Sequence, residues 1–70
     1  MQISFIGAGK VGVSLGKYFI SKGRKVGGYY SLSPESAAWA ANFTNTKQYQ
    51  SIKEIISSSD MIFFTVPDDK

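Results

Sequence analysis

The chain has 70 residues, 43% of them hydrophobic, and this length allows one small domain with a single core. It contains neither cysteine nor histidine, which excludes disulfides, thiolate metal sites and histidine-based acid–base chemistry within these residues. Eight basic and five acidic residues give a net charge of +3, and no apolar run is long enough to span a membrane. The composition therefore predicts a cytoplasmic protein with no bound metal and no membrane contact.

Five of the basic residues fall within the first 25 positions, a bias that a nucleic-acid surface would also produce. Four of them, Lys17, Lys22, Arg24 and Lys25, lie on or just beyond a predicted helix over residues 11–20, where a solvated face and the negative end of the helix dipole account for them. We expect no nucleic-acid partner.

The first element is a strand, residues 1–6, that runs directly into a complete G-x-G-x-x-G motif and then into the helix. Gly7 ends the strand with backbone angles that a Cβ would disfavour. Gly9 lets backbone N–H groups approach a pyrophosphate, and Gly12 lets the helix lie close to the strand. This position predicts a dinucleotide-binding turn at the positive end of the helix dipole. Its predicted cofactor contacts are Gly7, Ala8, Gly9, Lys10, Val11 and Gly12.

A tight strand–helix turn without a ligand would show the same glycines, and that alternative stays open. A phosphate-binding loop of the nucleoside-triphosphatase type is excluded, because Val13 and Ser14 follow Gly12 where that loop needs lysine and then serine or threonine. A signal peptide is excluded because the opening segment has no early charge and its apolar stretch is broken by glycines and Lys10.

The first helix carries apolar residues three and four positions apart, a spacing that predicts its core-facing side. These residues are Val11, Leu15, Tyr18 and Phe19, with Val13 and Ile20 widening the stripe. Gly23 follows as the C-cap.

The remaining elements alternate between strand and helix. A second strand over residues 25–30 contains two glycines, which mark a close approach by a backbone or ligand, or the packing of a helix. Ser33 and Pro34 begin a second helix that ends within residues 42–45, and a short third strand follows near residues 46–49. A capping box at residues 51–54 opens a third helix that continues to about residue 57. The apolar run of residues 61–66 predicts a fourth strand buried on both faces.

This β-α-β-α-β-α-β order predicts the fold class as α/β, a Rossmann-like parallel sheet with strand order 3-2-1-4 and helices on both faces. The fourth strand would then be an open apolar edge, which native proteins avoid. We therefore expect residues 1–70 to be the N-terminal portion of a dinucleotide-binding domain in a larger protein. A C-terminal domain or a second copy of the chain would cover the fourth strand.

The end of the second strand bears on the choice of cofactor. NAD sites place an acid there, about 20 residues beyond the glycines, to bind the ribose hydroxyls. Here that position is Ser31, and no acid occurs before Glu35. Ser31 and Ser33 offer hydroxyls and N–H groups near the start of the second helix, which favours NADP over NAD. A second interpretation, in which both serines serve only the turn and the cap, stays open.

Three segments together resemble a group of bacterial oxidoreductase-like proteins: residues 6–12, 30–37 and 60–69. These proteins have an N-terminal Rossmann-like domain and a mostly helical C-terminal domain of unknown function. They are related to pyrroline-5-carboxylate reductase and the β-hydroxyacid dehydrogenases. The resemblance covers nearly the whole chain.

The resemblance implies further site residues. The loop after the fourth strand contacts the nicotinamide ribose in such relatives, which corresponds here to Thr65, Val66 and Pro67. Relatives often carry Ser-Arg-Ser at the end of the second strand, and Leu32 stands where that arginine pairs the 2′-phosphate. Leucine can pack against adenine but cannot pair a phosphate, so NAD stays an alternative to NADP, with Lys10 as the nearest basic residue.

Catalytic groups of the relatives lie in their second domain, and Asp68 and Asp69 are interpreted as a solvated strand exit. The sequence thus predicts the NAD(P)-binding domain of an oxidoreductase, with NADP favoured and the substrate unknown. The alternative is a non-catalytic dinucleotide-binding or sensing module. A methyltransferase-type site for S-adenosylmethionine is disfavoured, because it normally needs an acid where Ser31 stands.

Overall fold

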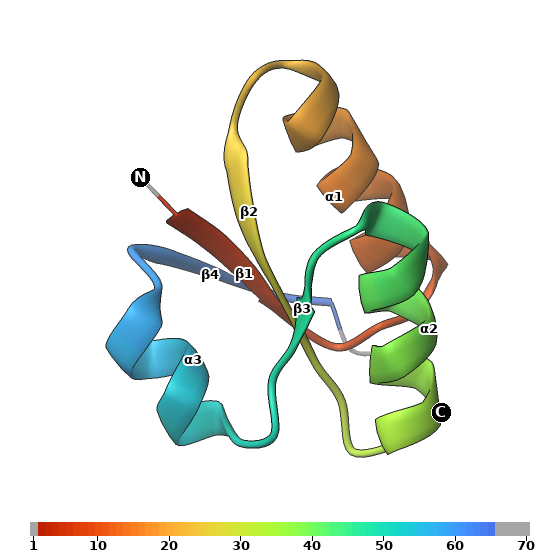
Figure 1. The fold of residues 1–70 in the computed structure, drawn as a ribbon, viewed down its shortest axis with the longest axis vertical. Coiled ribbons are helices and arrows are strands. Elements are labelled where there is room, and N and C mark those ends of the chain that lie inside the picture. Colours follow the sequence, from red (N-terminus) through yellow and green to blue (C-terminus); the bar gives the residue numbers. More distant parts are fainter. Residues whose placement is uncertain (1, 66–70) are drawn as a thin grey trace.

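The computed structural model describes residues 2–65, in which strands and helices alternate along the chain (Figure 1). The strands are β1 (Gln2–Ile6), β2 (Lys25–Tyr30), β3 (Lys47–Gln48) and β4 (Met61–Phe64). The helices are α1 (Lys10–Ser21), α2 (Pro34–Thr44) and α3 (Ile52–Ser58). None of these helices is long and apolar enough to cross a membrane.

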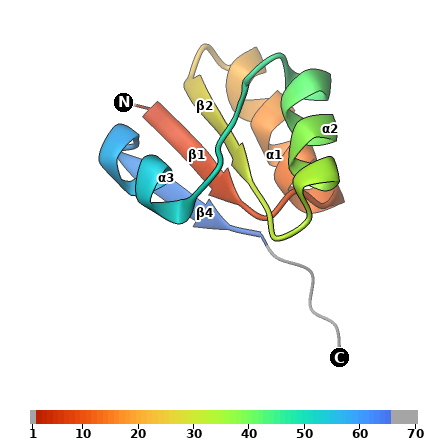
Figure 2. The same cartoon turned by 60° about the horizontal axis from the view of Figure 1, so that its bottom comes forward.

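The strands form one parallel sheet in the order β3-β2-β1-β4, with β1 paired to β2 on one side and to β4 on the other. Helices α1 and α2 lie on one face of the sheet and α3 lies on the other (Figure 2). The predicted α/β Rossmann-like fold and its strand order are therefore confirmed.

The two glycines of β2 occupy places where another backbone or side chain comes close. The register between β1 and β2 shifts at Gly27, and a Cβ there would lie 2.6 Å from the side-chain nitrogen of Gln2. A Cβ on Gly28 would collide with the carbonyl group of Lys47 in the neighbouring strand. Both glycines of β2 are therefore explained by the close approach of a neighbouring strand, which was one of the two predicted reasons for them.

Capping side chains begin two of the helices as their sequences indicate. The Ser33 hydroxyl accepts a hydrogen bond of 3.4 Å from the amide of Ser36 at the start of α2. The Ser51 hydroxyl accepts one of 3.2 Å from the amide of Glu54 at the start of α3. The Glu54 carboxylate in turn accepts a 2.7 Å bond from the amide of Gln50, one residue before the cap, so the expected box is present with its second bond shifted by one residue.

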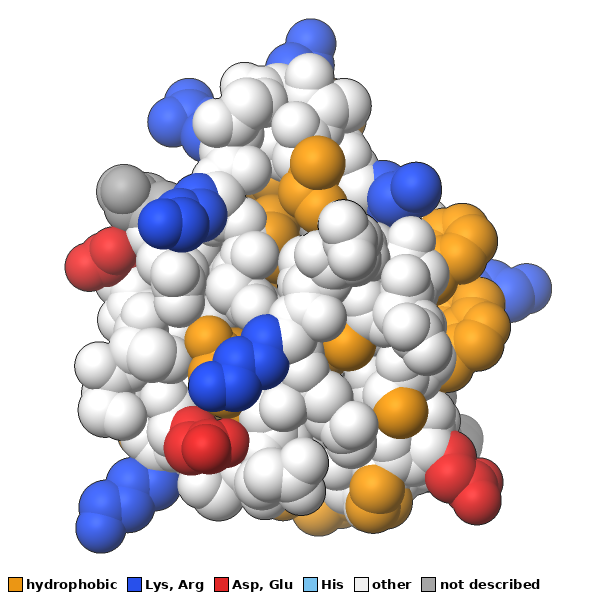
Figure 3. Space-filling model, in the orientation of Figure 1, with side chains coloured by type: hydrophobic (Ala, Val, Ile, Leu, Met, Phe, Trp, Pro, Cys, Tyr) orange, Lys and Arg blue, Asp and Glu red, His pale blue; other side chains and the backbone are white. Residues whose placement is uncertain are grey.

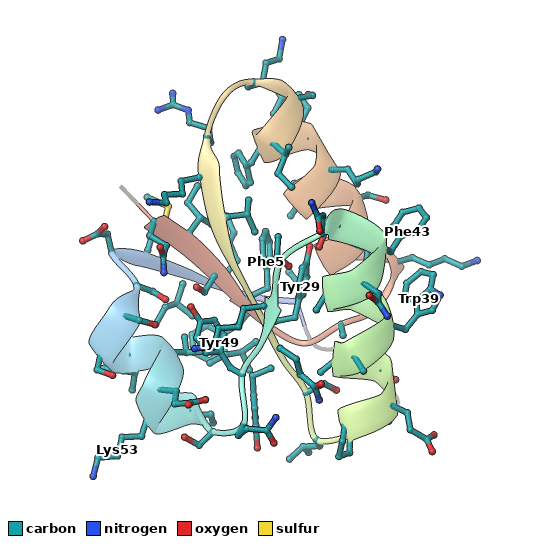
Figure 4. All side chains as sticks on the ribbon, in the orientation of Figure 1. Phe5, Tyr29, Trp39, Phe43, Tyr49 and Lys53 are labelled. Atoms are coloured by element: carbon teal, nitrogen blue, oxygen red, sulfur yellow. The ribbon has the colours of Figure 1, made fainter. Side chains whose placement is uncertain are left out.

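Two hydrophobic clusters hold the layers together. On the α1 and α2 face, the ring of Phe5 stacks on that of Tyr29 at 5.0 Å and on that of Phe63 at 5.6 Å. On the α3 face, Ile55 is fully buried against Ile6 and Tyr49. Figure 4 shows Phe5 and Tyr29 side by side at the centre of the fold, where β1 and β2 meet α1.

The face of α1 that packs on the sheet differs from the predicted one. Val11 and Tyr18 are 65% and 55% exposed, and Ile20 is also exposed. The buried residues of the helix are Gly12, Val13 and Gly16. Leu15 and Phe19 pack against the core only in part. The helix lies so close to the sheet that a face built on two glycines fits there, and the larger side chains at Val11 and Tyr18 turn outward.

The expectation that the fourth strand is buried on both faces is also wrong for the residues that the structure describes. Met61 is 40% exposed and Phe64 is 73% exposed. Within residues 2–65, β4 pairs with β1 alone, so its other edge and the ends of the strand face outward. The predicted continuation of the strand to Val66 lies outside the described residues.

Candidate dinucleotide site

The predicted site residues lie at the carboxyl ends of the strands. Strand β1 has β2 on one side and β4 on the other, so the chain leaves β1 in one direction and later returns on its opposite side. Such a reversal of strand order is where open parallel sheets bind their ligands. The glycine turn follows β1 at this point, residues 31–33 follow β2, and Thr65 follows β4.

The glycine turn has the backbone conformation that its sequence suggests. Gly7 adopts a φ of 111°, in the region that favours glycine, and its amide donates a 2.7 Å hydrogen bond to the carbonyl oxygen of Tyr30. Gly9 is the N-cap of α1, where it supplies no side-chain hydrogen bond, and the described first turn contains no acidic residue. Within the described residues, no capping side chain therefore occupies the start of α1, as an anion site at a helix N-terminus requires.

Thr65 connects the end of β4 to this turn. Its amide donates a 2.9 Å hydrogen bond to the carbonyl oxygen of Ile6, and its hydroxyl donates one of 3.3 Å to that of Gly7. A Cβ on Gly12 would lie 2.5 Å from the Thr65 hydroxyl oxygen and 3.2 Å from the carbonyl oxygen of Gly7. A side chain at position 12 would therefore disturb the close packing of α1 against Gly7 and Thr65.

Residues 31–33 follow directly on the β2 residue that pairs with Gly7. The Ser31 hydroxyl accepts a 3.2 Å hydrogen bond from the amide of Ser33, which folds the segment into a turn. Leu32 is 92% exposed and packs on none of the core residues. Both serines thus have structural roles, and as whole residues Ser31 is half-buried and Ser33 is exposed.

The structure brings together most of the residues that the sequence singled out. The turn residues 7–12 adjoin Ser31 through the Gly7–Tyr30 hydrogen bond and adjoin Thr65 directly. Lys10 and Val11 are exposed on the first turn of α1, and Leu32 projects from the neighbouring segment. Val66 and Pro67, together with Asp68 and Asp69, lie outside the described residues.

Tyr29 contacts the glycine turn, and reasoning from the sequence did not identify it. Its side chain is fully buried beneath α1, and its hydroxyl donates a 2.9 Å hydrogen bond to the carbonyl oxygen of Gly12, the third glycine of the motif. Burial raises the pKa of Tyr29 from its ordinary value of 10.0 to about 12. The four-residue spacing of Gly12 and Gly16 puts both on one helix face and is a sequence signal for close packing there, but it does not identify Tyr29 as the contact.

Two hollows lie on the surface that the structure describes. One of about 460 Å³ lies at the amino ends of the strands, between Phe19, Arg24 and Met61. Another, of about 470 Å³, runs along the outer side of α1 and includes Lys10 and Val11 at its end. The second hollow thus reaches two of the predicted site residues, and the assignment of the site rests on the conformation of the glycine turn.

An aromatic pair lies outside the site on α2. The rings of Trp39 and Phe43 stack at 5.2 Å while both side chains are about half exposed, and the Lys17 ammonium lies 4.9 Å from the centre of the Phe43 ring. Figure 3 shows this apolar surface at the right, over α2.

Comparison with known proteins agrees with the predicted fold and family. Residues 2–70 match the family described as NADP oxidoreductase, coenzyme F420-dependent. The fold is similar to UDP-N-acetylglucosamine 3-dehydrogenase GnnA from Acidithiobacillus ferrooxidans, with TM-scores of 0.86 and 0.82 for two crystal structures at 19% sequence identity. The match covers 96% of this chain and 22% of the dehydrogenase, so the chain spans about a fifth of that protein's length. No match was found among curated protein sequences.

Proposed function

The chain belongs to the family of NADP oxidoreductases described as coenzyme F420-dependent, and on that premise we propose that its glycine turn binds the pyrophosphate of a nicotinamide dinucleotide. Its family and Rossmann-like fold make it an NAD(P)-binding oxidoreductase domain. The observation that carries the proposal is the start of α1. There the backbone amides follow a glycine N-cap that has no side-chain cap, and they lie where the strand order reverses.

The proposed contacts divide among the three strand ends. Residues 7–12 bind the pyrophosphate with backbone N–H groups, since Gly9 places no side chain between the turn and the ligand. Residues 31–33 bind the adenosine ribose, and the exposed Leu32 packs against the adenine ring. Thr65, Val66 and Pro67 contact the nicotinamide ribose. The position of Thr65 against Gly7 supports this last assignment.

We propose NADP as the preferred cofactor, with NAD as the alternative. A carboxylate at the end of β2 would repel a 2′-phosphate, and residues 30–34 carry none. Ser31 and Ser33 lie instead at the N-terminus of α2, where the helix dipole favours negative charge. These features support NADP, although Leu32 supplies no positive charge to pair the phosphate.

Substrate binding and acid–base groups are proposed to come from a C-terminal domain or from a second copy of the chain. The apolar edge of β4 supports this, because Met61 and Phe64 expose side chains that a covering element would bury. The protein would then act in the cytoplasm as an oxidoreductase whose catalytic groups approach the nicotinamide from outside these residues.

Gly9→Val tests the proposed site. The valine side chain should enter the space of the pyrophosphate, so calorimetric titration of the full chain with NADPH and NADH should show binding by the parent and none by the variant. Ser14→Val is the matched control, because it adds the same side chain at an exposed position of α1 that is not among the proposed contacts. The proposal is contradicted if the parent binds neither dinucleotide, or if Gly9→Val binds as well as the parent.

A further inference from the structure

The second strand holds the glycine turn at two points. The carbonyl oxygen of Tyr30 accepts a 2.7 Å hydrogen bond from the amide of Gly7, the first glycine of the motif. The hydroxyl of Tyr29 donates a 2.9 Å bond to the carbonyl oxygen of Gly12, the third glycine. Neighbouring residues of β2 therefore fix both ends of the segment whose amides face the proposed pyrophosphate.

The hydroxyl of Tyr29 reaches Gly12 because α1 leaves room for it. A Cβ on Gly16, one turn beyond Gly12, would collide with this hydroxyl. The Tyr29 ring is held in place by stacking on Phe5 at 5.0 Å, so the hydroxyl has little freedom to move away. The carbonyl of Gly12 thus receives a donor from the sheet in addition to the helical N–H of the residue four positions later.

We propose that Tyr29 is a positioning residue for the cofactor. Its hydroxyl sets how far the first turn of α1 lies from the end of β2, and these two elements carry the pyrophosphate and the adenosine ribose in the proposed function, on which this inference rests. A dinucleotide bridges both places, so an error in their separation weakens its binding even though each place is intact.

The alternative to a positioning role is that Tyr29 only stabilises the hydrophobic core. Tyr49 is a matched control that separates the two possibilities. Tyr49 is also buried, at 4% exposure, and its hydroxyl accepts hydrogen bonds from the side chains of Gln2 at 3.3 Å and Ser58 at 3.1 Å. These partners lie at the start of β1 and the end of α3, away from the glycine turn. Figure 4 places Tyr49 beside α3 and Tyr29 beneath α1. Removing either hydroxyl should cost similar stability, while only one contacts the turn.

The experiment compares Tyr29→Phe and Tyr49→Phe with the parent in the full chain, at temperatures below all unfolding transitions. Tyr29→Phe should weaken NADPH binding about fivefold, roughly the effect of losing one buried hydrogen bond, and Tyr49→Phe should leave it unchanged. Adenosine 2′-monophosphate, which reaches only the β2 side, should bind all three proteins equally. Gly16→Ser added to Tyr29→Phe should restore binding, because a helical serine can donate to the carbonyl four residues earlier, here that of Gly12.

Several results would overturn the positioning role. The first is NADPH affinity in Tyr29→Phe equal to that of the parent. The second is a loss of NADPH affinity in Tyr49→Phe as large as in Tyr29→Phe. The third is a loss of affinity for adenosine 2′-monophosphate in Tyr29→Phe as large as its loss for NADPH. If the parent binds neither dinucleotide, the proposed function fails, and amide hydrogen exchange of residues 7–12 then decides the role of Tyr29. Faster exchange in Tyr29→Phe than in Tyr49→Phe would support control of the turn by this hydroxyl, and equal exchange would refute it.

Discussion

Gly16 lies directly against the hydroxyl of Tyr29, and a Cβ at position 16 would take the space of that hydroxyl and approach the ring carbon that bears it to 3.2 Å. Gly16→Ala should therefore lower the free energy of unfolding by about 1–3 kcal/mol through overpacking, despite the better helix propensity of alanine. In the Tyr29→Phe background the hydroxyl is gone, and the same change should cost far less or become favourable. Urea unfolding of the four proteins in this double-mutant cycle measures the coupling, and additive effects would contradict the contact.

The raised pKa of Tyr29 predicts a loss of stability in alkali. Burial raises this pKa from the ordinary value of 10.0 to about 12, so between these values the folded chain keeps a proton that the unfolded chain has released. The contribution of Tyr29 to the free energy of unfolding is fully present below pH 10. Above pH 10 it falls by about 1.4 kcal/mol for each pH unit, until the pH passes the pKa of the folded state. Urea unfolding of the parent and of Tyr29→Phe across this range should show a steeper decline in the parent. Parallel pH profiles would show that the hydroxyl does not titrate as described.

The order of strands and helices was predictable because most elements carry their own local signal. Ser33 with Pro34 begins α2, the box at residues 51–54 begins α3, and the apolar run from Met61 marks β4. Parallel pairing then follows from the alternation of strand and helix. The burial of β4 was not predictable from the run itself, because burial depends on which segments pair with its far edge.

The glycine turn was visible in the sequence, whereas its support from β2 was not. Periodicity detects large apolar side chains, so it assigned Val11 and Tyr18 to the core side of α1. The structure instead buries Gly12 and Gly16, because the distance between a helix and a sheet depends on which side chains of the sheet lie under the helix. That surface is the ring and hydroxyl of Tyr29, a residue 13 positions beyond Gly16, and no local pattern connects the two.

The cap of α3 should contribute measurably to stability. Ser51→Ala removes the hydroxyl that accepts the 3.2 Å hydrogen bond from the amide of Glu54, and the free energy of unfolding should fall by about 1 kcal/mol. Ser33→Ala should cost less, because its bond to Ser36 is longer at 3.4 Å and Pro34 still fixes the first helical residue. Chemical denaturation of both variants gives the comparison. A larger loss for Ser33→Ala would contradict this ranking of the caps.

Leu32→Arg should shift the cofactor preference further towards NADP. Leu32 is 92% exposed at the end of β2, so the change should alter the free energy of unfolding by no more than about 0.5 kcal/mol. The guanidinium group can make charge-assisted hydrogen bonds to a 2′-phosphate, and NADPH affinity should rise about tenfold while NADH affinity changes little. Leu32→Gln is the control, since it removes the apolar side chain without adding charge. Calorimetric titration at low and high salt should show a gain that shrinks with ionic strength but is absent for NADH. An equal gain for both dinucleotides would place the 2′-phosphate away from residue 32 and contradict the assignment of the adenosine ribose to the end of β2.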